Sequence, residues 1–145
     1  MPNYLPAALH KFQHPTPKCP QDFPHAWKKP VYVAAVQWTD NPDKSPILPP
    51  QSITLVQQII RTLLYYAISV DPNMLAALGS IAAQQSKAIQ QTYDEVLWLL
   101  NYDASHPGAT TRYSASDMIL HVHSNASYLS EPKAQCRTGG HYYMA

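Results

Sequence analysis

The sequence predicts a mixed α+β chain, and three observations carry that prediction. Prolines concentrate in residues 1–50, apolar residues then recur at helical spacing as far as residue 107, and after Gly108 the pattern changes to strand-like alternation. We therefore expect a proline-rich arm over residues 1–50, a three-helix region over 51–107 and an incomplete β-sheet over 108–145. At 145 residues, the chain is long enough for one modest domain.

The arm holds most of the chain's 14 prolines. Proline fixes φ and has no backbone N–H, so long helices and central strands are excluded from most of this segment. The exception is residues 4–12, where apolar residues recur every three or four positions and predict a short helix. We expect an extended loop over 14–50, with a brief strand at 31–37, where β-branched and aromatic residues cluster.

Three helices are expected over residues 52–68, 73–86 and 89–103. Ser52 is a suitable N-cap for the first, and Asp71 with Pro72 forms a start signal for the second. The stripes expected to be buried are Ile53, Val56, Ile60, Leu63, Leu64 and Ala67 on the first helix, Met74, Leu75, Leu78, Ile81 and Ala82 on the second, and Ile89, Tyr93, Val96, Leu97 and Leu100 on the third.

Strands are predicted at residues 110–114, 118–124 and 140–144, with an irregular loop over 125–139. A sheet of so few strands leaves backbone donors and acceptors unpaired at its edge. We therefore expect either an incomplete domain or a sheet that another chain completes.

Composition narrows the function classes. The formal net charge is +1 and charged residues make up 13% of the chain, so any nucleic-acid contact must be local. Cys19 and Cys136 have no C-x-x-C partner, which argues against a zinc knuckle or a disulfide framework and favours the cytoplasm or nucleus. No signal peptide or long apolar run is present, so we expect no secretion and no membrane partner.

Two sets of residues are candidate binding sites. His121 and His123 alternate on one strand face, and His141 on the next strand could approach them as a zinc site, although such histidines are more often surface or packing residues. The second set contains the cations Lys28, Lys29 and Arg112, which together with nearby aromatic residues could contact nucleic acid. The alternative is that the segment is a proline-rich linker packed on the helices.

Four runs, taken in order, resemble the polyprotein of copia-type retrotransposons. Residues 1–5 are similar to that family's M-P-G-Y, and 56–67 resemble V-x-x-I-x-G-x-L-L-Y-x-A, with a departure at Arg61 and Thr62, where the family often has Gly or Thr. Residues 121–128 and 137–143 are similar to Y-S-D-A-D-W and S-T-S-G-Y-x-F. The resemblance spans nearly the whole chain, from the end of a reverse transcriptase into the first strands of a ribonuclease H-like domain.

The resemblance implies that this chain lacks a catalytic centre. The polymerase palm would lie upstream of Met1, and the metal-binding Asp of the first nuclease strand maps onto Asn125, whose neutral amide holds Mg²⁺ poorly. Asp117 would lie about 26 Å from Asn125 along a straight strand, so only Glu131 could approach it. The family's remaining acidic ligands would lie beyond Ala145. We therefore expect no cofactor here, although the family uses Mg²⁺.

The expected function is a remnant that connects polymerase and nuclease, with an RNA–DNA hybrid or other regions of the polyprotein as partners. One alternative is a domesticated interaction module that uses the helices and the open sheet edge, including for self-association. Another is a metal-dependent ribonuclease H whose missing carboxylates come from a second chain.

Overall fold

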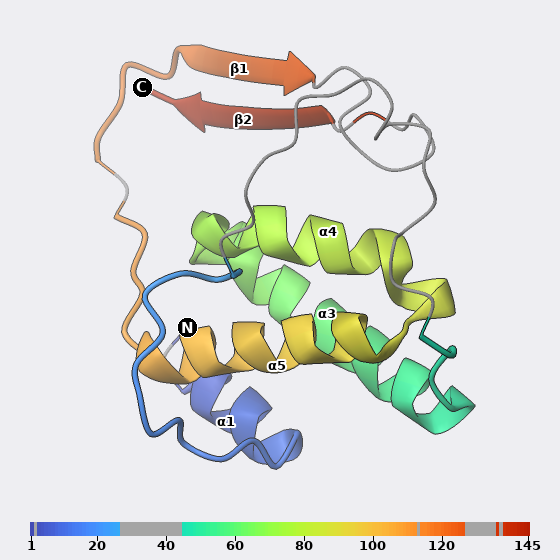
Figure 1. Cartoon of the computed structure of the whole chain (residues 1–145). Coiled ribbons are helices and arrows are strands. Elements are labelled where there is room, and N and C mark those ends of the chain that lie inside the picture. Colours follow the sequence, from blue (N-terminus) through green and yellow to red (C-terminus); the bar gives the residue numbers. More distant parts are fainter. Residues whose placement is uncertain (2, 27–44, 113, 127–135, 137) are drawn as a thin grey trace. The chain divides into compact units, whose positions relative to one another are not determined.

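The computed structural model describes residues 1, 3–26, 45–112, 114–126, 136 and 138–145, and its mixed α+β content agrees with the sequence prediction. Contacts divide the chain into two compact units. The helical unit comprises Met1–Trp27 and Ser45–Thr111, and the hairpin unit comprises Lys28–Lys44 and Arg112–Ala145. The helices are α1 (Tyr4–Lys11), α3 (Pro50–Ser69), α4 (Leu75–Gln84) and α5 (Gln90–Ser105), with the 3₁₀ turns η1 (Pro72–Met74) and η2 (Gln85–Lys87), and the strands are β1 (Leu120–Ala126) and β2 (Thr138–Met144) (Figure 1).

Helix α3 begins two residues before the start that the sequence predicts. Pro49 is its N-cap and Pro50 its first residue, so Ser52 lies inside the first turn and the N-cap prediction was wrong. Proline suits this position because its fixed φ is already helical and its missing N–H would have had no partner there. The first turn is closed by the Ile53 N–H, which donates to the Pro49 carbonyl at 3.1 Å.

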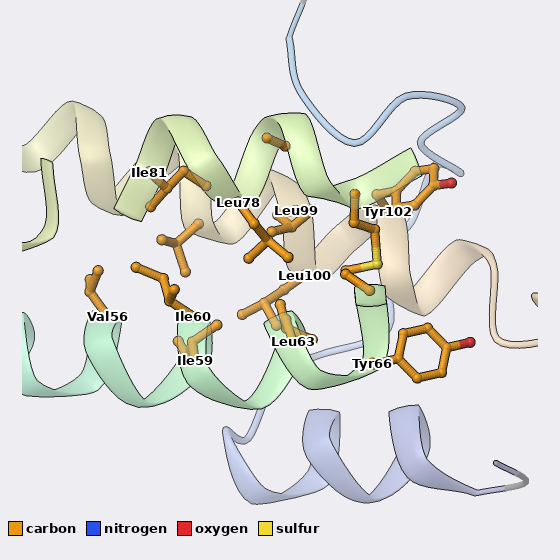
Figure 2. Close-up of a cluster of buried hydrophobic side chains, with 14 of the residues drawn as sticks. Val56, Ile59, Ile60, Leu63, Tyr66, Leu78, Ile81, Leu99, Leu100 and Tyr102 are labelled. Atoms are coloured by element: carbon orange, nitrogen blue, oxygen red, sulfur yellow. The ribbon is translucent and has the colours of Figure 1, made fainter. Parts of the chain in front are cut away.

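The apolar face of α3 is the centre of the hydrophobic core (Figure 2). The predicted stripe is correct for Val56, Ile60, Leu63 and Ala67, but Leu64 is 40% exposed. Helical geometry explains the difference, because a residue 100° beyond Leu63 turns off the buried face. The buried α3 residues are Val56, Ile59, Ile60, Leu63, Tyr66 and Ala67.

The second predicted helix is a sequence of three pieces, η1, α4 and η2. Its start signal is confirmed, because the Asp71 carboxylate accepts the Asn73 N–H at 3.2 Å and Pro72 opens η1. The predicted burial of Leu75 was wrong, since this side chain is 38% exposed. Residues that complete the core from α4 and α5 include Leu78, Ile81, Val96, Leu99, Leu100 and Tyr102 (Figure 2).

The described part of the proline-rich arm packs on the helices. The predicted short helix is α1, and the Tyr4 hydroxyl donates to the Thr62 carbonyl of α3 at 3.0 Å. Past α1, His14 Nε2 lies 2.8 Å from Asn101 Oδ1, and the Trp98 indole N–H donates to the Phe23 carbonyl at 3.0 Å. The arm therefore contacts α3 and α5. The strand predicted at 31–37 lies outside the described residues.

The hairpin unit contains a two-stranded antiparallel sheet in its described residues. Strand β1 begins and ends two residues later than predicted, and the described residues 110–112 and 114 form no strand, contrary to the prediction. In β2, the Tyr142 ring lies against Gly140, where an added Cβ would come within 2.8 Å of it. Every residue of both strands is exposed.

No helix in the described residues is long and apolar enough to span a lipid bilayer.

Replacing Leu63 tests the importance of the α3 face. Leu63 is 0% exposed, so Leu63→Ala should leave a cavity and lower the free energy of unfolding by about 2–5 kcal/mol. Leu64→Ala is the matched control, and its exposed position predicts a change within about 0.5 kcal/mol. Urea unfolding followed by circular dichroism measures both. Equal losses in the two variants would contradict the assigned face.

Candidate functional site

Asn125, the position that corresponds to a catalytic Asp in the resemblance, lies on β1 opposite Gly139 of β2. Its side chain is exposed, and its amide oxygen accepts the backbone N–H of Ala126 at 2.9 Å. A neutral oxygen that already accepts a backbone hydrogen bond is a weak ligand for Mg²⁺, which prefers carboxylates. The local geometry at Asn125 therefore stabilises the end of the strand.

Among the described residues of the hairpin unit, Asp117 carries the one side-chain carboxylate. Asp117 lies three residues before β1, next to the end of the hairpin where Leu120 pairs with Met144, whereas Asn125 lies near the opposite end. Glu131 lies outside the described residues. Across the described parts of the chain, no group of three His, Cys, Asp or Glu side chains is arranged to hold a metal ion.

The three predicted histidines share one face of the hairpin. His123 lies directly opposite His141, and His121 lies opposite Tyr143, so strand pairing brings all four rings together. The Tyr143 ring centroid is 5.2 Å from those of His121 and His141 and 5.8 Å from that of His123. The Tyr143 hydroxyl also lies 3.3 Å from His123 Nε2. The imidazoles therefore pack around a tyrosine ring in this conformation.

The structure describes one of the three candidate nucleic-acid-binding residues, Arg112. Lys28 and Lys29 lie outside the described residues. Arg112 is exposed and belongs to the hairpin unit, immediately after the last residue of the helical unit. The exposed guanidinium of Arg112 is therefore accessible to a phosphate.

The helical unit contains a buried carboxylate pair that the sequence analysis missed. Asp71 is 5% exposed and accepts two hydrogen bonds, from the Asn73 N–H and, at 3.3 Å, from the Tyr102 hydroxyl. Asp103 is 1% exposed, and neither of its carboxylate oxygens has a hydrogen-bond partner among the residues that the structure describes. One buried carboxylate thus accepts two hydrogen bonds, and its neighbour accepts none from the described residues.

These environments change the pKa of Asp103 and of two neighbouring tyrosine hydroxyls. Burial, and then the nearby charge of Asp71, raises the pKa of Asp103 to about 8. Burial first and Asp71 second also raise the pKa values of the Tyr66 and Tyr102 hydroxyls. Asp103 is therefore mostly protonated at neutral pH, because an unpaired buried carboxylate is far costlier than its neutral form.

A signal for this site exists in the sequence. Asp103 follows Leu99 and Leu100 at the helical spacing of three or four residues, which places it on the buried face of α5. Asp103 is the last residue of the helix predicted over 89–103, and its burial was not predicted because acidic residues are almost never fully buried unless they are paired.

In comparisons with known proteins, no family model, no curated protein and no solved structure matches this chain.

Proposed function

We propose that this chain is the connecting region of a copia-type retrotransposon polyprotein, which joins polymerase and nuclease parts and has no catalytic centre of its own. The order of its elements supports the proposal. The run over 56–67 that resembles the family forms most of α3, and the two later runs overlap β1 and β2. A helical unit followed by a hairpin is the order that such a region requires.

The geometry at Asn125 is the observation that carries the non-catalytic part of the proposal. Two-metal phosphodiester hydrolysis needs several carboxylates that converge on cations about 4 Å apart. Here the strand-end residue is an amide, its oxygen accepts the Ala126 N–H, and Asp117 lies at the far end of the hairpin. The proposed role is therefore structural, with no cofactor held by this chain.

The proposed partners are an RNA–DNA hybrid and other regions of the same polyprotein, inside the cell. The adjacent Lys28 and Lys29, together with Arg112, would contact phosphates locally, since a net charge of +1 provides no broad basic surface. Such contacts position a duplex without reading its sequence.

Restoring the missing carboxylate tests the non-catalytic role. Asn125→Asp supplies one anionic oxygen, but one carboxylate cannot hold two cations in line with a phosphate, so neither the natural chain nor the variant should cleave a labelled RNA–DNA hybrid with Mg²⁺ or Mn²⁺. Ser124→Asp, one position away on the opposite face of β1, is the matched control.

Two results would contradict this proposal. Cleavage by the natural chain that is lost in Asn125→Ala would identify an active nuclease. Cleavage by Asn125→Asp but not by Ser124→Asp would show that other acidic groups, with Glu131 the first candidate, complete a site around position 125.

A second candidate function is an interaction module, and the other face of the hairpin favours it. Leu120 and Val122 lie opposite Met144 and Tyr142, so four exposed apolar side chains share one face. A two-stranded sheet is marginally stable alone in water. A second copy of the chain is the occupant that we assign to this face, because the face carries no charged side chain and two copies would bring no like charges together.

Sedimentation velocity tests the module. The natural chain should associate in a concentration-dependent way, and Val122→Lys should make it monomeric, because it places a charge in the apolar face. His121→Lys changes the neighbouring residue on the opposite face and should leave association intact. A natural chain that stays monomeric at all concentrations would rule out this function.

A further inference from the structure

The C-terminal turn of α5 carries a buried acid in an unfavourable place. Asp103 is the third residue from the end of the helix, where the unpaired carbonyls give the helix its partial negative charge. Its two oxygens have no hydrogen-bond partner in the described parts of the chain. A negative charge at this position is opposed by burial, by the helix end and by Asp71 together.

Groups on three elements face this acid, and none of them supplies a positive charge. Tyr66 comes from α3, Asp71 from the corner between α3 and η1, and Tyr102 from α5 itself. Tyr4 of α1 stacks on Tyr66 with 5.8 Å between the ring centroids. Asp71 accepts two hydrogen bonds, while Asp103 accepts none from the described residues.

The same turn anchors the segment that leaves the helical unit. His106 stacks on Tyr102 with ring centroids 4.5 Å apart, and its Nδ1 lies 3.0 Å from the Tyr102 carbonyl. Farther along, Ala109 packs on the core, and the Thr111 hydroxyl donates to the Val70 carbonyl at 2.6 Å. Residues 106–111 are therefore held against the end of α5 and the corner after α3.

We propose that Asp103 is a proton-operated latch: its protonated carboxyl keeps the last turn of α5 and residues 106–111 closed on the α3–η1 corner, and loss of the proton opens them. The charged carboxylate can be hydrated only if the turn that buries it unwinds. Opening the turn removes the stack of His106 on Tyr102 and frees the segment that leads from α5 to the Thr111 contact with Val70. This inference is independent of the proposed polyprotein role.

The sign of the pH dependence follows from the raised pKa. Between about pH 4, where Asp103 ionises in the unfolded chain, and about pH 8, where it ionises in the folded chain, the folded state binds more protons. Raising the pH through this window should therefore lower stability, by up to tenfold in the folding equilibrium constant per pH unit, or about 1.4 kcal/mol. Above about pH 8 this contribution should become constant.

Urea unfolding of the full chain from pH 5 to pH 9.5 tests the latch. Asp103→Asn keeps the shape without the charge, so it should remove this pH dependence and be more stable than the natural chain at pH 8. Asp94→Asn, an exposed position on the same helix, is the matched control and should leave the dependence unchanged. A natural chain whose stability does not fall through this window, or an Asp103→Asn variant that retains the natural profile, would overturn the proposal.

Nuclear magnetic resonance of the natural chain tests the same proposal without requiring that a variant folds. The side-chain carboxyl carbon of Asp103 should titrate near pH 8, and amide exchange over residues 103–111, corrected for its intrinsic pH dependence, should rise more steeply there than in α3. Titration near pH 4 in the folded chain would overturn the proposal. So would titration near pH 8 without the steeper exchange, because Asp103 would then be a buried acid that moves nothing.

Discussion

Burial of the α3 face is the constraint on which the helical unit depends. Its side chains meet α4 and α5, and the Tyr4 contacts fasten α1 to the same helix. Each fully buried leucine or isoleucine contributes about 1.5–3 kcal/mol relative to exposure. The hairpin has no comparable source of stability in its described residues, because all of its strand side chains are exposed.

The same apolar core makes ionisation of the buried Asp103 unfavourable. Asp103 lies beside the same side chains that exclude water from the core, so no solvent compensates its charge. For Asp71, in the same region, hydrogen bonds from a backbone N–H and a tyrosine hydroxyl replace the lost contacts with water. Both carboxylates are almost completely buried, and they differ in the hydrogen-bond donors that Asp71 has and that Asp103 lacks among the described residues.

Periodicity predicted the helices well because burial of one face is a property that the sequence encodes directly. It located α1, α3 and α5, and the Asp71–Pro72 signal placed the start of η1. It failed for Leu64 and Leu75, since the edge of an apolar face is set by which neighbours pack there. Two of the three predicted strands were found: β1 is shifted by two residues and β2 begins two residues earlier than predicted, because an alternating pattern fixes the faces more firmly than the ends.

The candidate site was less predictable, for a physical reason. The pairing of His123 with His141 follows from strand register, which the sequence only suggests. The charge that acts on Asp103 comes from Asp71, which lies 32 positions away in the sequence. The proposed function comes from the resemblance of four runs in order, and the geometry at Asn125 supports its non-catalytic part.

The most direct test of the connecting role is to sequence the native transcript through this chain and identify the translated peptides by mass spectrometry. The proposed connecting role predicts one continuous reading frame, with a polymerase palm and its paired aspartates encoded before Met1 and the remaining nuclease carboxylates encoded after Ala145. A translated frame with neither of these neighbours would contradict it.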